Sequence, residues 1–112
     1  MKNQLAVALL VLTASSAHAQ FFGDSRSRRD DAYKQYLACV KKYAESSAGQ
    51  NALPSDIASA ALSACDDHYQ RMLLPTYELF GYTQWANDVL TETRQKARDY
   101  AIQAVLEARR IR

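Results

Sequence analysis

The sequence contains few residues that interrupt a helix. Its only glycines are Gly23, Gly49 and Gly81, and its only prolines are Pro54 and Pro75. It has no Asn-Gly or Asp-Gly pair and no sustained alternation of polar and apolar residues, so β-hairpins are not predicted. The stretches between these residues are rich in alanine, leucine, glutamine, lysine, arginine and glutamate, which lose little side-chain freedom in a helix. We therefore predict an all-α fold.

The residue types that build most catalytic and metal sites are also scarce. The chain has two histidines, His18 and His68, no glycine-rich phosphate loop and no Ser-x-x-Lys motif. Zinc sites and activated nucleophiles need several such groups together. We therefore predict no catalytic residue, no metal and no cofactor. The absence of these motifs does not exclude a catalytic pair of carboxylates. The alternative is therefore a small enzyme or a hydrolase-accessory protein with a carboxylate site.

A short apolar run stands near the N-terminus. The run Leu5–Leu12 follows Lys2 and precedes small and polar residues that end in Ala17-His18-Ala19. This three-part order is typical of a secretory signal peptide. A membrane-spanning helix would need ~20 apolar residues. An N-terminal membrane anchor is the alternative.

We predict a signal peptide at residues 1–19, cleaved between Ala19 and Gln20, with cleavage after Ala17 as the second choice. The remaining residues, 20–112, suffice for a single domain. Loss of Lys2 leaves 14 − 1 = 13 basic against 12 acidic residues, so the formal charge gives no reason to expect a nucleic-acid partner. We expect a periplasmic or secreted protein that is not an integral membrane protein.

Apolar residues recur with helical spacing in three segments. The predicted helices cover about residues 27–48, 55–74 and 83 to the C-terminus, and together they form an antiparallel three-helix domain. The apolar arc expected to be buried on the third helix consists of Trp85, Val89, Ala97, Tyr100, Ala101, Ala104, Ala108 and Ile111.

The ends of these helices have local signals. Ser27 with Asp30 three residues later is a predicted N-terminal cap, and Gly49 is a predicted stop. Pro54 suits the first turn of the second helix. Pro75 is expected to end or kink that helix, because proline lacks the backbone N–H of the helical ladder.

Two cysteines lie at equal distances from the first connector. With the connector centred near residue 52, Cys39 precedes it by 52 − 39 = 13 residues and Cys65 follows it by 65 − 52 = 13. In an antiparallel helical hairpin these positions come level. Exported compartments are oxidising, so we predict a Cys39–Cys65 disulfide, with a free reactive thiol as the alternative.

The cysteine in the tyrosine-rich first helix is paired with the run Ala60–Cys65 in the second helix. This pattern resembles small exported proteobacterial proteins of unknown function that contain a paired-cysteine helical hairpin. The resemblance covers about residues 33–72. It implies a periplasmic setting and no particular activity.

Large apolar residues are concentrated around the second connector. Tyr77, Phe80 and Trp85 are candidate partner contacts, because aromatic residues are enriched at the centres of interfaces. The alternative is that the connector folds over the bundle and completes its core. The full set is Leu73, Leu74, Tyr77, Leu79, Phe80, Tyr82 and Trp85.

Charged residues on two helices require separate interpretations. Arg94 and Arg98 lie within the third helix and are candidate anion contacts, with an ordinary solvated face as the alternative. Arg109 and its neighbours at the C-terminus suit the helix dipole. His68 falls on the apolar arc of the second helix, so we expect a partly buried, hydrogen-bonded histidine, with a pH-sensing group as the alternative.

Ile102 and Leu106 lie outside the predicted buried arc of the third helix. We interpret them as a contact for self-association or for a helical partner, although isolated surface hydrophobes are also common. The sequence thus predicts an exported helical binding or structural module that acts on an unknown protein or on a component of the cell envelope.

Overall fold

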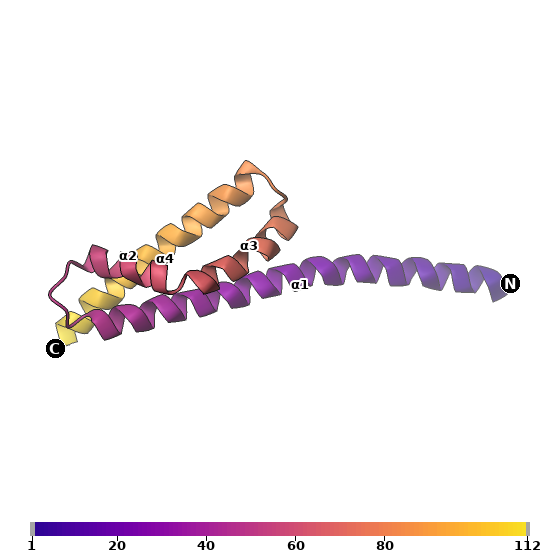
Figure 1. The fold of residues 1–112 in the computed structure, drawn as a ribbon. Coiled ribbons are helices and arrows are strands. Elements are labelled where there is room, and N and C mark those ends of the chain that lie inside the picture. Colours follow the sequence, from indigo (N-terminus) through magenta and orange to yellow (C-terminus); the bar gives the residue numbers. More distant parts are fainter. Residues whose placement is uncertain (1, 112) are drawn as a thin grey trace.

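The computed structural model describes the backbone of residues 2–111 and the side chains of residues 23–111. Within this range the chain forms four helices and no strand: α1 (Lys2–Ser47), α2 (Pro54–Ala64), α3 (Asp66–Phe80) and α4 (Gln84–Ile111) (Figure 1). The all-α prediction is confirmed. The predicted signal peptide and its cleavage site between Ala19 and Gln20 fall outside the described side chains and stay a prediction.

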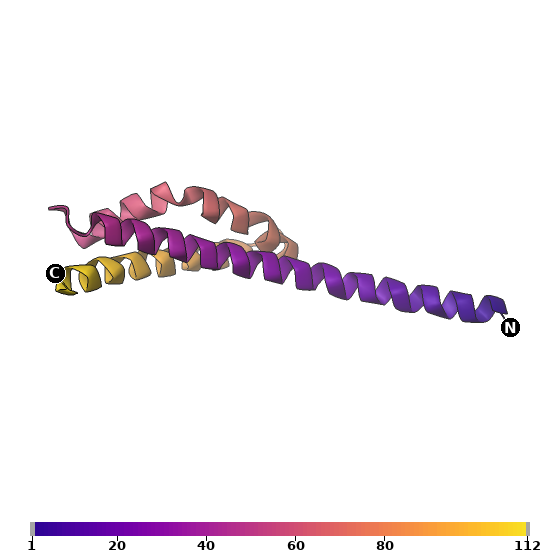
Figure 2. The same ribbon diagram turned by 90° about the horizontal axis from the view of Figure 1, so that it is seen from below.

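The helices form an elongated bundle. After the first connector, α2 and α3 return along α1 in the opposite direction, and α4 then runs back so that its C-terminal end lies beside the α1–α2 connector (Figure 1). Seen from below, α2 and α3 lie on one side of α1 and the C-terminal part of α4 lies on the other (Figure 2). α3 and α4 diverge from each other toward their connector (Figure 1).

Alanine dominates the core where α1, α2 and α4 meet. Ala44, Ala58, Ala61, Ala97 and Ala101 are completely buried. Side chains this small let helix axes approach closely, because the interaxial distance depends on the residues at the contact. Larger residues fill the core toward α3, and they include Tyr36, Val40, Tyr69 and Met72.

The disulfide prediction is confirmed. Cys39 of α1 is bonded to Cys65, and their Cα atoms are 5.9 Å apart, as level positions on facing helices allow. Cys65 also divides the predicted second helix into α2 and α3. Its backbone leaves helical geometry, with φ −101° and ψ 15°. Asp66 and Asp67 then occupy the first turn of α3, where carboxylates interact favourably with the helix dipole.

Pro75 does not end the helix. α3 continues through it to Phe80, and both Pro75 and Thr76 are buried. The Thr76 hydroxyl donates a 2.6 Å hydrogen bond to the carbonyl oxygen of Met72. Packing of this buried face thus outweighs the loss of one backbone hydrogen bond.

The other terminal signals have mixed outcomes. Pro54 is the first residue of α2, as predicted. The Ser27 cap is wrong, because α1 continues without interruption on the N-terminal side of Ser27. α1 ends at Ser47, close to the predicted stop at Gly49. Gly81 ends α3 in a left-handed conformation, with φ 72°, that only glycine adopts without strain.

Candidate binding site at the diverging end of α3 and α4

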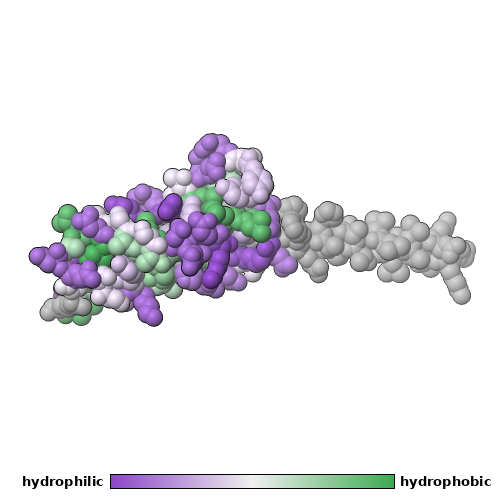
Figure 3. Space-filling model, viewed as in Figure 1, coloured by the Kyte–Doolittle hydropathy of each residue, from purple (hydrophilic) through white to green (hydrophobic). Residues whose placement is uncertain are grey.

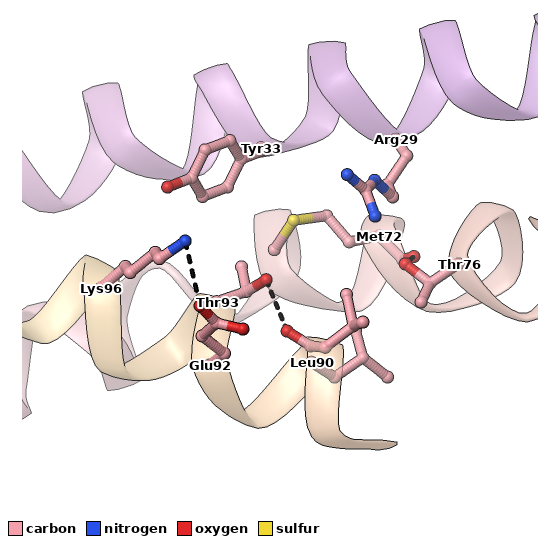
Figure 4. A pocket seen from close by; sticks show the side chains of 9 residues that line it. Arg29, Tyr33, Met72, Thr76, Leu90, Glu92, Thr93 and Lys96 are labelled. Atoms are coloured by element: carbon pink, nitrogen blue, oxygen red, sulfur yellow. Dashed lines mark hydrogen bonds and ion pairs between the residues drawn. The ribbon is translucent and has the colours of Figure 1, made fainter. Parts of the chain in front are cut away.

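A cleft of about 280 Å³ opens between α1, α3 and α4, on the side where α3 and α4 diverge. Figure 4 shows side chains from all three helices pointing into it. Its walls are formed by Arg29 and Tyr33 of α1, Met72 and Thr76 of α3, and Val89, Leu90, Glu92, Thr93 and Lys96 of α4.

The floor of the cleft is apolar. Met72 and Leu90 are buried members of the core, and Met72 lies between the two walls (Figure 4). The Thr76 and Thr93 hydroxyls donate to carbonyl oxygens of their own helices, to Met72 at 2.6 Å and to Val89 at 2.8 Å. Their hydrogens are therefore occupied within the protein.

Two cations stand over this floor from opposite walls. Arg29 projects from α1, and its Nη2 atom is 3.9 Å from a carboxylate oxygen of Asp30. Lys96 projects from α4, and its Nζ is 3.2 Å from Glu92 one turn earlier, in a pair that is mostly exposed to solvent. Exposed pairs of this kind are weak, so neither cation is firmly held by its neighbour.

An aromatic end adjoins the cleft; we use this term for Tyr77, Phe80, Tyr82 and Trp85. The rings of Phe80 and Trp85 are 5.0 Å apart, and those of Tyr77 and Tyr82 stack at 4.6 Å. Tyr82 is 84% exposed and Trp85 is 65% exposed. In Figure 3 this end of the bundle projects from the body of the molecule, with hydrophobic surface at its base.

The connector thus does not fold entirely over the core. Leu73 and Tyr77 are partly buried against the core, whereas Leu74, Tyr82 and Trp85 face solvent. The three predicted contact residues Tyr77, Phe80 and Trp85 lie together at this end, but whether they contact a partner stays a prediction.

Arg29 links the aromatic end to the cleft. Its guanidinium lies 5.6 Å from the centre of the Phe80 ring, a geometry in which cation and ring attract. A second hollow of about 350 Å³ has Arg29 in its wall together with Arg26, Asp30, Leu79 and Phe80. The cleft and the aromatic end therefore form one continuous surface.

Glu78 fixes this end of α3 against α1. Its carboxylate accepts hydrogen bonds from the hydroxyl of Ser25, which is fully buried, and from Arg28 at 2.5 Å. The Ser25 hydrogen bond is the main cause that holds the pKa of Glu78 below its ordinary value, and Arg28 adds to it. This carboxylate is thus ionised at neutral pH and positions the aromatic end.

The predicted anion contacts are both engaged within the protein. Arg94 lies over the Tyr69 ring at 4.7 Å and is 3.9 Å from Asp66. Arg98 donates a 2.8 Å hydrogen bond to the hydroxyl of Ser59 on α2. The sequence could not reveal these partners, because they come from other helices. Arg94 and Arg98 thus contact residues of neighbouring helices, and their role as anion contacts stays a prediction.

The tyrosines beside Arg94 are unusually buried. Burial raises the pKa of Tyr36 and of Tyr69, and the nearby charge of Arg94 opposes this rise in part. The Tyr36 hydroxyl has no hydrogen-bond partner among the described residues. Nδ1 of His68 likewise has no hydrogen-bond partner among the described residues. His68 is partly buried, as expected, but the predicted hydrogen bond is not found for this atom.

Ile102 and Leu106 have different environments. Leu106 is 52% exposed, in line with its predicted place outside the buried arc, whereas Ile102 packs against the core and does not belong to an exposed strip. The buried stripe of α4 is Ala86, Leu90, Ala97, Ala101 and Val105. This stripe is rotated around the helix axis from the predicted arc. The predicted arc included Trp85 and Ile111, and both are largely exposed.

Among the described residues, no three histidine, cysteine, aspartate or glutamate side chains are grouped as metal ligands would be. None of the helices, within the same part of the chain, is long and apolar enough to cross a membrane. Comparison with protein-family models, with curated proteins and with solved structures finds no match to this chain.

Proposed function

We propose that the protein is an exported helical binding module, located in the periplasm or outside the cell, that binds a protein or a component of the cell envelope. In this proposal α2 and α3 are one interrupted helix, so that residues 20–112 form a three-helix domain. The Cys39–Cys65 disulfide supports an oxidising compartment. The resemblance of the paired-cysteine hairpin to small exported proteobacterial proteins fits the same setting.

Export with removal of residues 1–19 is supported by the order of the N-terminal residues, in which Lys2 precedes the apolar run Leu5–Leu12 and Ala17-His18-Ala19 follows it. N-terminal sequencing of exported material should begin at Gln20, and recovery of the intact chain with Met1 in a membrane fraction would contradict export with cleavage.

One observation carries the proposal of binding. Tyr82 and Trp85 are large aromatic residues exposed beside a cleft that contains two cations. Rigid aromatic side chains and arginine are the residues most enriched at binding hot spots. We propose binding rather than catalysis, because the one carboxylate in the wall of the cleft, Glu92, is paired with Lys96, whereas glycosidase-type hydrolysis uses two.

Site-specific photo-crosslinking tests this proposal. A photoreactive phenylalanine analogue at Tyr82 should capture a partner in intact cells, and the same analogue at Lys42, an exposed position on α1 outside the cleft, should not. Replacement of Trp85 by alanine should reduce capture from Tyr82, because the aromatic surface is lost. Equal capture at both positions, or none at either, would contradict binding through the aromatic end.

A further inference from the structure

We infer that the cleft between α1, α3 and α4 binds a small amphipathic anion, namely a short alkyl chain with a carboxylate head group. This inference goes beyond the proposed function, because it concerns a small ligand of the cleft and not the macromolecule proposed to bind at the aromatic end. Three observations carry it: two cations and a single carboxylate line the cleft, its floor is apolar, and its volume is small.

The polar groups of the cleft favour an anion. Arg29 carries five N–H donors, and Lys96 carries three. Arg29 is 3.9 Å from Asp30, which is longer than a hydrogen bond, so this pair leaves its donors available. The only carboxylate in the wall, Glu92, is matched by Lys96 alone. Two cations therefore face one carboxylate in the wall, and a ligand with acceptor oxygens and a negative charge complements this excess of positive charge.

The apolar floor favours an alkyl chain rather than a bare inorganic anion. Met72 and Leu90 are buried and Val89 is half-buried, and all three line the cleft. Figure 4 shows Met72 and Leu90 at this position. The two threonines use their hydroxyl hydrogens on their own helices. Methionine has a flexible side chain that adapts to ligands of irregular shape. A chain placed on this floor would be shielded from water while its head group reaches Arg29.

The volume limits the length of that chain. About 280 Å³ is near the lower end of the roughly 300–1,000 Å³ found for small-molecule sites, so the cleft suits a short chain rather than a membrane lipid. Trp85, the only tryptophan, lies one helical turn before Val89 and contacts Phe80. Trp85 is outside the wall of the cleft but close to it, so its fluorescence serves as the readout of binding.

The experiment titrates octanoate, octanol and octylammonium into the purified, oxidised protein and follows Trp85 fluorescence. The three probes share one chain and differ in the charge of the head group. We expect saturable binding of octanoate that is at least tenfold tighter than that of octanol or octylammonium. Similar affinity for octanoate and octanol would overturn the inference, because the cations would then contribute nothing.

Variants of the two cations sharpen the test. Arg29→Gln with Lys96→Gln should lower octanoate affinity at least tenfold, to that of octanol, whereas Lys34→Gln, an exposed α1 residue outside the cleft, should leave it unchanged. Arg29→Glu with Lys96→Glu should reverse the preference toward octylammonium. A misfolded variant would not show such a reversal. Unchanged octanoate binding in either double variant would place the ligand elsewhere.

The two proposals fail in distinguishable ways. If Tyr82 captures a partner in cells but octanoate shows no saturable binding, the inference about the ligand is wrong and the proposed binding function stands. If octanoate binds with the expected charge preference but Tyr82 captures nothing, the amphipathic anion is supported and binding of a macromolecule through the aromatic end is contradicted.

Discussion

The guanidinium of Arg109 donates a hydrogen bond from Nε to the carbonyl oxygen of Ala48, across a distance of 2.9 Å. Its Nη2 atom also donates to the carbonyl oxygens of Gln50 and Ala52, at 3.0 and 2.6 Å. One side chain near the end of α4 therefore satisfies backbone groups at the end of α1 and in the α1–α2 connector. Its role is to cap another helix, which goes beyond the interaction with its own helix dipole that the sequence suggests.

Replacement of Arg109 should destabilise the protein. Hydrogen bonds from a charged group contribute about 1.5–3 kcal/mol each, and partial exposure lowers this value, so we expect Arg109→Ala to cost about 2–3 kcal/mol in total. Arg109→Lys should recover little, because an ammonium cannot reproduce the planar geometry of the three contacts. Chemical denaturation measures the loss.

Arg110 provides the matched control. It forms an exposed ion pair with Glu107 at 2.8 Å, one turn away on the same helix. Arg110→Ala should change the free energy of unfolding by no more than about 0.5 kcal/mol. Equal losses in the Arg109 and Arg110 variants would show that the contacts with the connector do not stabilise the fold.

The disulfide should contribute strongly to stability. It joins residues 26 positions apart in sequence, and in the chain-entropy model a loop of this length stabilises by roughly 3–4 kcal/mol. We therefore expect Cys39→Ser with Cys65→Ser to melt well below the oxidised wild type. The reduced wild type should melt close to the variant. An unchanged midpoint after verified reduction would contradict this prediction.

Acid should weaken the contact between α3 and α1. The pKa of Glu78 is held below its ordinary value of 4.5 in the folded protein, so the carboxylate contributes stability that is fully present above that value. This stability is lost as the pH falls through the lower, folded pKa. Glu78→Gln should therefore lower the melting temperature at pH 7 and flatten its fall below pH 5.

Glu45→Gln is the control for acid sensitivity. Glu45 forms an exposed pair with Lys41 at 3.9 Å, and both side chains are half-exposed. This variant should keep the wild-type dependence of melting temperature on pH. If Glu78→Gln shows the same dependence as wild type, Glu78 is not the group that titrates.

The disulfide was predictable because level positions on a helical hairpin follow from arithmetic on the sequence. The interruption at Cys65 also has a sequence signal, since Asp66 and Asp67 form the kind of acidic pair that begins a helix. The helical period alone predicted one unbroken helix. Pro75 was predicted to end or kink the helix, and α3 continues through it. Its burial depends on contacts between helices, which the sequence does not display.

The candidate site was predictable only in part. Tyr77, Phe80 and Trp85 are conspicuous as a run of large residues, whereas Arg29 and Lys96 have no local feature that distinguishes them from other surface cations. Their place in one cleft depends on how α3 and α4 diverge from each other beside α1 (Figure 1). The predicted arc on α4 was centred on the large apolar residues of this helix. The residues of α4 that are buried are mostly alanine, so the predicted stripe is rotated around the helix axis from the buried one.

The two apolar residues Ile102 and Leu106 should respond differently to a charge. Ile102 packs against the core, so Ile102→Asp places an unpaired carboxylate in an apolar setting and should cost about 2–4 kcal/mol. Leu106 is largely exposed, so Leu106→Asp should stay within about 0.5 kcal/mol of wild type. Urea unfolding of both single variants measures the difference.

Association gives a second measurement on the same two variants. If Leu106 belongs to a contact between copies of the chain or with a helical partner, Leu106→Asp should abolish that association while the melting temperature in dilute solution is kept. Sedimentation of the wild type and the variant over a range of concentrations tests this. Identical sedimentation of the two proteins would remove Leu106 as a contact, and a strongly destabilised Leu106→Asp would contradict its exposed position on α4.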